Sequence, residues 1–186
     1  MLLNSREQFG SAAIALHWVI AILFVVQIPL GYATQVTEAY PETQFALYQW
    51  HKSMGFLILS ISAVRVAWWL ANACPDLPAH MPAVERFAAS LSKRVLLLLT
   101  LAVPLAGWAT VSSSPLEIPS FAFNLVVVPH LPLPRSDEAE AIWSNIHGVL
   151  AYFAGALAAL HALAALRHHF LLRDDVLLRM LGQRRR

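Results

Sequence analysis

The chain has 186 residues and a formal net charge of +2; 58% of the residues are hydrophobic and 13% are charged. Because soluble proteins average about 25% charged residues, this composition excludes a disordered chain, a collagen-like repeat and an ordinary cytosolic enzyme. The basic residues lie between and beyond apolar blocks, which favours the charge asymmetry of a membrane protein over nucleic-acid binding.

The N-terminal segment, MLLNSREQFGS, lacks the basic region, short apolar core and small-residue cleavage site of a signal peptide. We therefore expect the first apolar block to be kept as a membrane span. The only cysteine is Cys74. A single cysteine excludes an internal disulfide, a multi-cysteine zinc site, an iron–sulfur cluster and haem attached through a CxxCH motif.

Four segments contain the roughly 20 largely apolar residues that a membrane-spanning helix needs. They run near residues 11–34, 47–71, 93–111 and 142–172. Pro29 and Pro104 lie late within spans and are expected to kink them. The connection over residues 112–140 is Pro-rich and contains a short apolar stretch, FAFNLVVV, that is too short to span and is expected at the membrane interface.

The basic residues are concentrated on one side of this topology. That side carries ten of them in the N-terminus, the second connection and the C-terminal tail: Arg6, Arg86, Lys93, Arg94, Arg167, Arg173, Arg179, Arg184, Arg185 and Arg186. The other side carries Lys52 and Arg135. The positive-inside rule then places both termini in the cytoplasm. The sequence predicts an all-α, transmembrane four-helix antiparallel bundle that forms one domain over residues 1–186.

Four of the eight histidines lie within or at the mouths of spans: His17, His51, His147 and His161. His147 and His161 are 14 residues apart, which is nearly four helical turns, so they share one face at an axial separation of about 21 Å. Each one alone could simply hydrogen-bond a neighbouring helix. The topology, however, places His51 opposite His147 on the outer side and His17 opposite His161 on the inner side.

Two imidazoles from opposed helices can fill both axial positions of one haem iron, which gives an electron-transfer centre without an open position. Zinc usually takes three or four protein ligands, so two separated pairs suit it poorly. The residues therefore predict two non-covalently bound haem b groups, with His17, His51, His147 and His161 as iron ligands.

Glycines in the spans could let a flat macrocycle approach a helix backbone: Gly55, Gly148 and Gly155 lie near the histidines, and Gly31 and Gly107 lie elsewhere in the spans. The other interpretation, which we favour for glycines alone, is that small residues bring helices together.

Other polar residues support two interpretations each. Arg65, the one charge well inside a span, could bind a haem propionate or extend to the cytoplasmic interface. Lys52 could attract an anion to the outer haem, although an ordinary interfacial lysine is the simpler interpretation. His80 and His130 are expected to be polar loop residues. His168 and His169 could reach a headgroup or a quinone oxygen, with interfacial solvation as the default, since both lie at the inner end of the fourth span.

Together these features resemble the bacterial cytochrome b561 family of four-helix di-haem proteins, over about residues 11–180. The motifs that carry the resemblance are ALHWVI, HKSMG, PLAG, WSNIHGVLAY, LHALAAL and HHFLLRDDVLLRML. The resemblance implies two b-type haems and quinone chemistry, with ubiquinone as the substrate, and it places His168 near the quinone. One relative is similar to a superoxide oxidase. Many members begin the third span with a histidine that is followed four residues later by a tyrosine. This chain has Lys93 and Leu97 at those positions, so the resemblance does not extend to substrate contacts from that helix.

We therefore expect a di-haem b-type cytochrome of the bacterial inner membrane. It would carry electrons between quinone and superoxide or a periplasmic redox protein, as a superoxide oxidase-like oxidoreductase surrounded by lipid. One alternative is a cytochrome b subunit of a larger dehydrogenase or hydrogenase. Another, from a different class, is a histidine-based membrane metal transporter; the lack of acidic residues within the spans argues against proton coupling of that kind.

Overall fold

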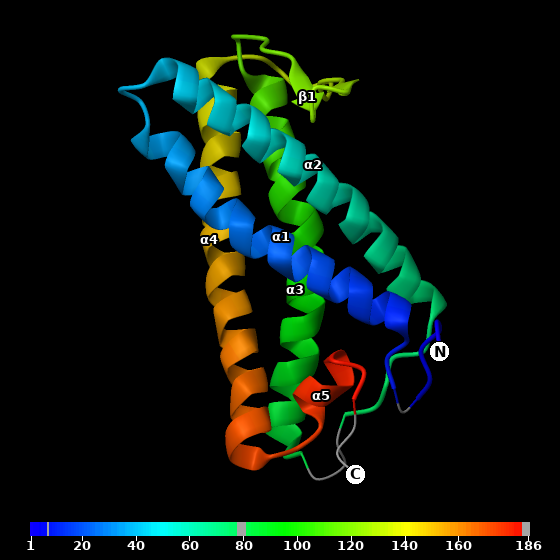
Figure 1. Ribbon diagram of the computed structural model, residues 1–186. Coiled ribbons are helices and arrows are strands. Elements are labelled where there is room, and N and C mark those ends of the chain that lie inside the picture. The colour runs from blue at the N-terminus through cyan, green and yellow to red at the C-terminus, as the bar shows by residue number, and fades with distance from the viewer. Residues whose placement is uncertain (7, 78–80, 184–186) are drawn as a thin grey trace.

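The computed structural model describes residues 1–6, 8–77 and 81–183 (Figure 1). His80 and Arg184–Arg186, which the sequence interpretation used, lie outside the described residues. Within them, four long helices form the fold: α1 (Ser11–Val36), α2 (Pro41–Ala71), α3 (Ala83–Ser113) and α4 (Asp137–Arg167). The π-helix η1 (His168–Leu172) continues α4, and the short helix α5 (Val176–Met180) follows. The predicted helical fold with four helices able to span a membrane is confirmed.

Two helices extend well beyond the predicted spans. Helix α2 begins at Pro41 rather than near residue 47, and α3 begins at Ala83 rather than near residue 93. Hydropathy marks where side chains meet hydrocarbon, whereas backbone hydrogen bonding continues through the polar residues beyond it. Pro41 occupies the first turn of α2, where a proline costs no helical hydrogen bond.

The helices form two antiparallel hairpins, α1 with α2 and α3 with α4, and the first crosses the second obliquely (Figure 1). The N-terminal segment and α5 lie at one end of the bundle, here called the terminal end. The α1–α2 connection and a small β-hairpin lie at the opposite end, here called the hairpin end. The side of the membrane that each end faces stays a prediction.

A small apolar core lies midway along the bundle. It is formed by Leu99 and Val103 of α3 and Ala154 of α4, with Phe24 of α1 packed against it. Many other apolar side chains, such as Leu98, are exposed on the outside of the helices. This pattern suits a protein whose outer surface is covered by lipid rather than by water.

The β-hairpin consists of β1 (Ser120–Ala122) and β2 (Val126–Val128), and the sequence interpretation did not predict it. Phe123 and Asn124 in its turn have positive φ values of 54° and 57°. The hydroxyl of Ser53 on α2 lies 2.9 Å from the Phe121 carbonyl oxygen and accepts the Phe123 N–H at 3.0 Å. The hairpin is thereby held against α2 two residues after His51.

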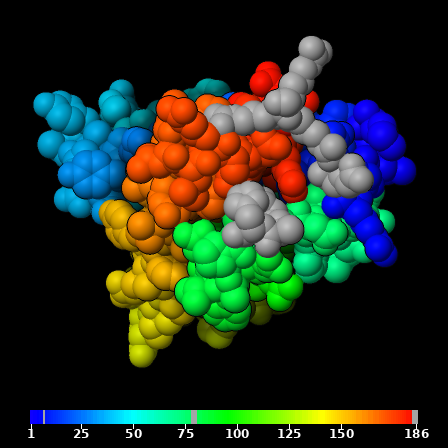
Figure 2. All heavy atoms as spheres, turned by 90° about the horizontal axis from the view of Figure 1, so that it is seen from below, coloured from blue at the N-terminus to red at the C-terminus, as the bar shows by residue number. Residues whose placement is uncertain are grey.

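The terminal end is closed by contacts between segments that are distant in sequence. The Trp18 indole donates to the Met180 carbonyl at 2.7 Å, and Arg179 donates to the Asp76 carbonyl at 2.7 Å. Seen from this end, η1 lies beside the start of α3, and α5 lies on the side of the N-terminal segment (Figure 2). The chain after α4 therefore folds back over the bundle.

Candidate metal centres

The first candidate centre lies toward the hairpin end, where His51 of α2 faces His147 of α4. Their ring centroids are 5.9 Å apart, and the ring planes are inclined at 85°. His51 is at the eleventh position of α2, and His147 is at the eleventh position of α4. Because both helices begin at this end, equal depth along each helix brings the two rings together.

The second candidate centre lies toward the terminal end, where His17 of α1 faces His161 of α4. Their ring centroids are 6.4 Å apart, and the planes are inclined at 69°. These two pairs are the ones that the sequence interpretation placed opposite each other. The role of the four histidines as iron ligands stays a prediction.

Both separations fit a metal ion held between two rings. Imidazoles that bind one metal from opposite sides place their ring centres roughly 6 Å apart, because each metal–nitrogen bond is about 2 Å and each nitrogen lies about 1 Å from its ring centre. Edge-to-face packing of two rings gives a similar separation, of about 4.5–7 Å. The ring distances alone therefore do not distinguish a metal centre from a packed ring pair.

The backbone arrangement favours the metal centre. Close backbone contacts are concentrated in the pairs α1–α2, α2–α3 and α3–α4. The histidine pairs instead bridge α2 with α4 and α1 with α4, whose backbones approach each other at few points in the described part of the chain. A flat group needs this kind of separation between the helices that ligate it.

Glycines stand directly against the rings of the hairpin-end pair. A Cβ on Gly31 of α1 would lie 2.8 Å from His51 Cε1, and one on Gly107 of α3 would lie 3.0 Å from His147 Cε1. The glycines that lie near the histidines in sequence do not pack against the rings in this way. Gly148 has no neighbouring atom within 4 Å of an added Cβ, and Gly55 meets only Gln27 at 3.6 Å. Ring contacts come from the adjacent helices instead.

A hydrogen bond orients one of the two hairpin-end rings for metal ligation. The Nδ1 atom of His147 lies 2.9 Å from the Val103 carbonyl oxygen. A carbonyl only accepts, so Nδ1 carries the proton and the Nε2 lone pair is left for a metal, as is usual for ligating histidines. On the other ring, His51 Nδ1 is buried without a hydrogen-bond partner among the described residues.

The terminal-end pair has a different environment. An Arg65 guanidinium nitrogen lies 3.1 Å from His17 Nδ1. Guanidinium only donates, so Nδ1 accepts there, and Arg65 is directed at the ring rather than toward the interface. Lys93 and Arg65 both lie near enough to His161 to interact with it electrostatically. Two positively charged side chains therefore lie near this centre, which suits the carboxylates of a haem.

The remaining sequence candidates lie outside the two pairs. The Lys52 ammonium donates to the Pro119 carbonyl at 3.4 Å and thus contacts the segment that leads into the β-hairpin. His130 lies in the α3–α4 connection, 3.5 Å from Arg135. His168 is buried at the terminal end, with Nδ1 2.5 Å from the Asp174 carboxylate. The sequence interpretation missed Asp174, because it lies beyond the predicted span.

Zinc finds no suitable ligand set in the described residues. They contain no group of three or more histidine, cysteine or acidic side chains that could hold a metal ion. Zinc sites ordinarily use at least three protein ligands. The paired histidines therefore suit a metal whose other ligands come from a cofactor, as the porphyrin nitrogens do in haem.

Comparison with known proteins supports this chemistry. The chain is 30% identical over 183 residues to cytochrome b561 homolog 2 of Escherichia coli, covering 97% of this chain and 94% of that protein. It is 31% identical over 183 residues to cytochrome b561 homolog 1 of the same organism, covering 96% and 99%. It is 28% identical over 185 residues to the probable superoxide oxidase CybB of Yersinia pestis, covering 97% and 99%.

The family model described as prokaryotic cytochrome b561 matches residues 8–183. This range includes all four long helices and both histidine pairs. Nearly complete coverage, together with four helices able to span a membrane, shows that the chain belongs to the prokaryotic cytochrome b561 family and is a multi-pass membrane cytochrome b that carries electrons.

Proposed function

We propose that this cytochrome holds two haem b groups and carries electrons across the bacterial inner membrane. His51 and His147 would ligate one group near the hairpin end, and His17 and His161 would ligate the other near the terminal end. The observation that carries the proposal is the presence of two ring pairs, with centroid separations of 5.9 Å and 6.4 Å, at opposite ends of one bundle. When bound, each haem would supply a one-electron centre with both axial positions filled.

The protein side chains would hold, orient and separate these groups. His147 keeps its Nδ1 proton on the Val103 carbonyl, which fixes the ring and leaves Nε2 toward the metal. Arg65 would exchange its contact with His17 for a haem carboxylate, which a guanidinium binds in a forked geometry. Residues of the mid-bundle core, including Ala154 and Phe24, exclude water between the two centres.

We infer that the hairpin end faces the periplasm and that the terminal end, with both termini, faces the cytoplasm. The asymmetry of basic residues supports this orientation. The donor at the periplasmic end would be superoxide or a periplasmic redox protein. Superoxide is favoured by the similarity to the probable superoxide oxidase of Yersinia pestis. Ubiquinone would accept electrons at the terminal end near His168, giving a superoxide:ubiquinone oxidoreductase.

Haem stoichiometry tests the ligand assignment. The protein should be purified from cells supplied with iron and a haem precursor, and haem should be measured by the pyridine haemochrome method. We expect two haem b per wild-type chain. His51→Ala or His147→Ala should remove the hairpin-end haem, and His17→Ala or His161→Ala should remove the other, leaving one haem in each variant.

The loop residue His130 provides a control, because it lies outside both pairs and His130→Ala should keep two haems. A reductive titration should show two different remaining centres in the two groups of variants. Two haems in all four ligand variants would show that the pairing is wrong. Wild-type protein without colour would contain no haem and would refute the whole proposal.

A further inference from the structure

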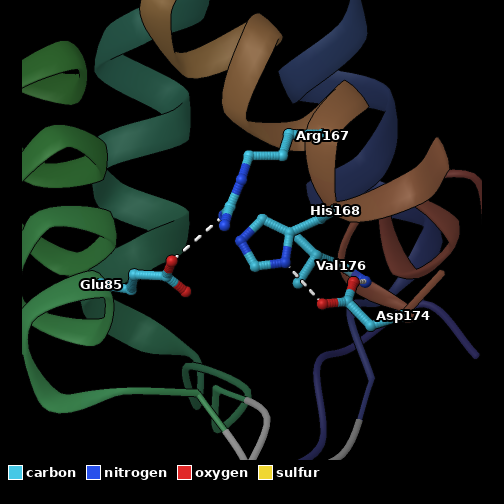
Figure 3. A network of polar contacts seen from close by, with 5 residues as sticks. All are labelled: Glu85, Arg167, His168, Asp174 and Val176. Carbon is cyan, nitrogen blue, oxygen red and sulfur yellow. Dashed lines mark hydrogen bonds and ion pairs between the residues drawn. The ribbon is translucent and has the colours of Figure 1, made fainter. Parts of the chain in front are cut away.

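A buried carboxylate–histidine pair lies at the terminal end. His168 Nδ1 is 2.5 Å from Asp174 Oδ2, and the side chains are only 11% and 7% exposed (Figure 3). A carboxylate in this position forms a strong, charge-assisted hydrogen bond with a ring N–H. Burial of both partners restricts water from competing for the bond, so the ring orientation is fixed by the carboxylate.

The local backbone is shaped to bring these two residues together. Helix α4 passes into the π-helix η1 at His168, and Arg173 then takes a left-handed conformation with φ of 55°. The Asp174 N–H donates to the His168 carbonyl at 3.1 Å. The second carboxylate oxygen, Oδ1, accepts the Val176 N–H at 3.0 Å at the start of α5. One oxygen is thus anchored on the backbone while the other holds the imidazole.

His168 is aligned with the terminal-end centre. It follows His161 by seven residues, so it lies on nearly the same face of α4, about 10 Å further along the axis. The same spacing connects Ala154, which is fully buried, to His161. This face therefore points into the bundle, and His168 continues it toward the terminal surface. The ring nitrogen opposite Asp174 is directed to the side where Arg167 meets Glu85 (Figure 3).

We propose that Asp174 is a positioning residue for proton transfer to ubiquinone at the terminal end. It holds the Nδ1 proton of His168, so that Nε2 is the atom presented to a quinone carbonyl oxygen. The proposal rests on the proposed function, because it requires ubiquinone to accept electrons at this end. It adds a role for a residue that does not itself touch the substrate.

Ubiquinone gains two electrons from the cytochrome, which a one-electron donor such as superoxide supplies in two turnovers, and it gains two protons. One quinone oxygen forms an O–H bond as the Nε2–H bond of a protonated His168 breaks, and the other oxygen, on the opposite side of the quinone ring, takes its proton from water. The ring is left neutral with its proton on Nδ1, where Asp174 accepts it, and water at the terminal surface returns a proton to Nε2. Asp174 stabilises the charged ring before transfer and keeps the tautomer after it.

Asparagine at position 174 separates this role from a purely structural one. In Asp174→Asn the amide oxygen can still accept the Val176 N–H, so the turn is retained. The amide nitrogen would face His168 Nδ1 as a donor, which moves the ring proton to Nε2 and removes the stabilising charge. Asp175→Asn is the matched control, because it makes the same chemical change one residue away.

The experiment measures steady-state reduction of ubiquinone-1 by purified protein with a superoxide-generating system, and fits kcat and KM separately. We expect Asp174→Asn to lower kcat by roughly a hundredfold while KM stays within about twofold. Asp174→Glu should recover part of the rate, and Asp175→Asn should match wild type. Haem content and dithionite-reduced spectra should be equal in all four proteins.

A spectroscopic measurement gives a second readout that does not depend on turnover. In protein labelled with nitrogen-15 at histidine, the His168 signals are identified by their loss in His168→Gln. In the neutral ring, wild type should show the proton on Nδ1, and Asp174→Asn should show it on Nε2.

The outcomes separate the two proposals. Wild-type protein that holds haem but does not reduce ubiquinone-1 would overturn the proposed quinone function. Wild-type turnover with an unchanged kcat in Asp174→Asn, an unchanged tautomer, or an equal loss in Asp175→Asn would overturn the role of Asp174 alone. A variant that loses kcat only together with haem or thermal stability would also overturn it, because the residue would then be structural.

Discussion

The two ends of the bundle hold similar histidine pairs in different surroundings. At the hairpin end, the rings are enclosed by helix backbone: Gly31 and Gly107 stand against them, and the Val103 carbonyl accepts a ring proton. At the terminal end, the ring of His17 is held by Arg65, and Lys93 lies near its partner His161. The first centre is defined by tight packing and the second by charge.

This difference indicates different tasks. A tightly packed centre with few ionisable neighbours suits electron exchange that does not move protons. A centre close to arginine and lysine, with His168 of the His168–Asp174 pair nearly two turns beyond His161, suits an acceptor that takes up protons with its electrons. The asymmetry thus supports the proposals that electrons enter at the hairpin end and that quinone is reduced at the terminal end.

The largest expected effect comes from filling the close contact at Gly31. In Gly31→Ala the new methyl carbon would lie 2.8 Å from His51 Cε1, so the ring or helix α1 must move. We expect loss of most of the hairpin-end haem, so that purified protein contains about one haem per chain instead of two. Pyridine haemochrome measurement and a two-step redox titration would show which centre is lost.

Gly148→Ala is the matched control, because no atom lies within 4 Å of its added carbon although it follows His147 directly. It should keep both haems and should be slightly more stable, since alanine favours helix by up to about 1 kcal/mol over glycine. Equal haem loss in the two variants would show that packing against the rings is not what distinguishes this end.

A smaller effect is expected from removing charge at the terminal end. Arg65→Gln removes a positive charge that would stabilise the reduced form of the nearby haem. We expect the midpoint potential of that centre to fall, on the order of tens of millivolts, while the other centre is unchanged. Arg65→Lys, which keeps the charge, should shift it less. A shift confined to the hairpin-end centre would contradict the assignment of Arg65 to the terminal-end haem.

The smallest effect is expected at Lys52. Lys52 directly follows His51 in the chain, and its ammonium group contacts the Pro119 carbonyl. Its charge therefore lies near the proposed entry site for superoxide. Lys52→Glu should slow electron transfer from superoxide a few-fold at low ionic strength, and added salt should reduce the difference. Stopped-flow measurement with Lys52→Arg as the control would test this. A rate that is unchanged, or that falls equally at high salt, would dismiss steering by this residue.

The four long helices were predictable because each contains an uninterrupted apolar stretch of span length. The facing of His51 with His147 and of His17 with His161 followed from alternating helix direction and from a 14-residue interval that preserves the helix face. These two properties depend on chain order and helical periodicity alone. The role of the four residues in binding haem stays a prediction.

Other features depend on geometry that a single sequence does not encode in a simple pattern. The early start of α3 at Ala83 and the β-hairpin at Ser120–Val128 lie outside the apolar spans, where hydropathy gives no signal. The Asp174 contact requires a π-helical turn and a left-handed Arg173. Ring contacts from Gly31 and Gly107 depend on how neighbouring helices cross, which periodicity within one helix cannot reveal.

The seven-residue alignment on α4 has a consequence for how this protein can change over time. Helix α4 carries one histidine of each pair and the buried alanine between them, and His168 directly follows its last residue, so all four share a rotational register. A single inserted or deleted residue would turn everything beyond it by about 100°. Length changes in this helix are therefore tolerable only in near-whole numbers of turns, and the spacing between the two proposed redox centres can change only in discrete steps.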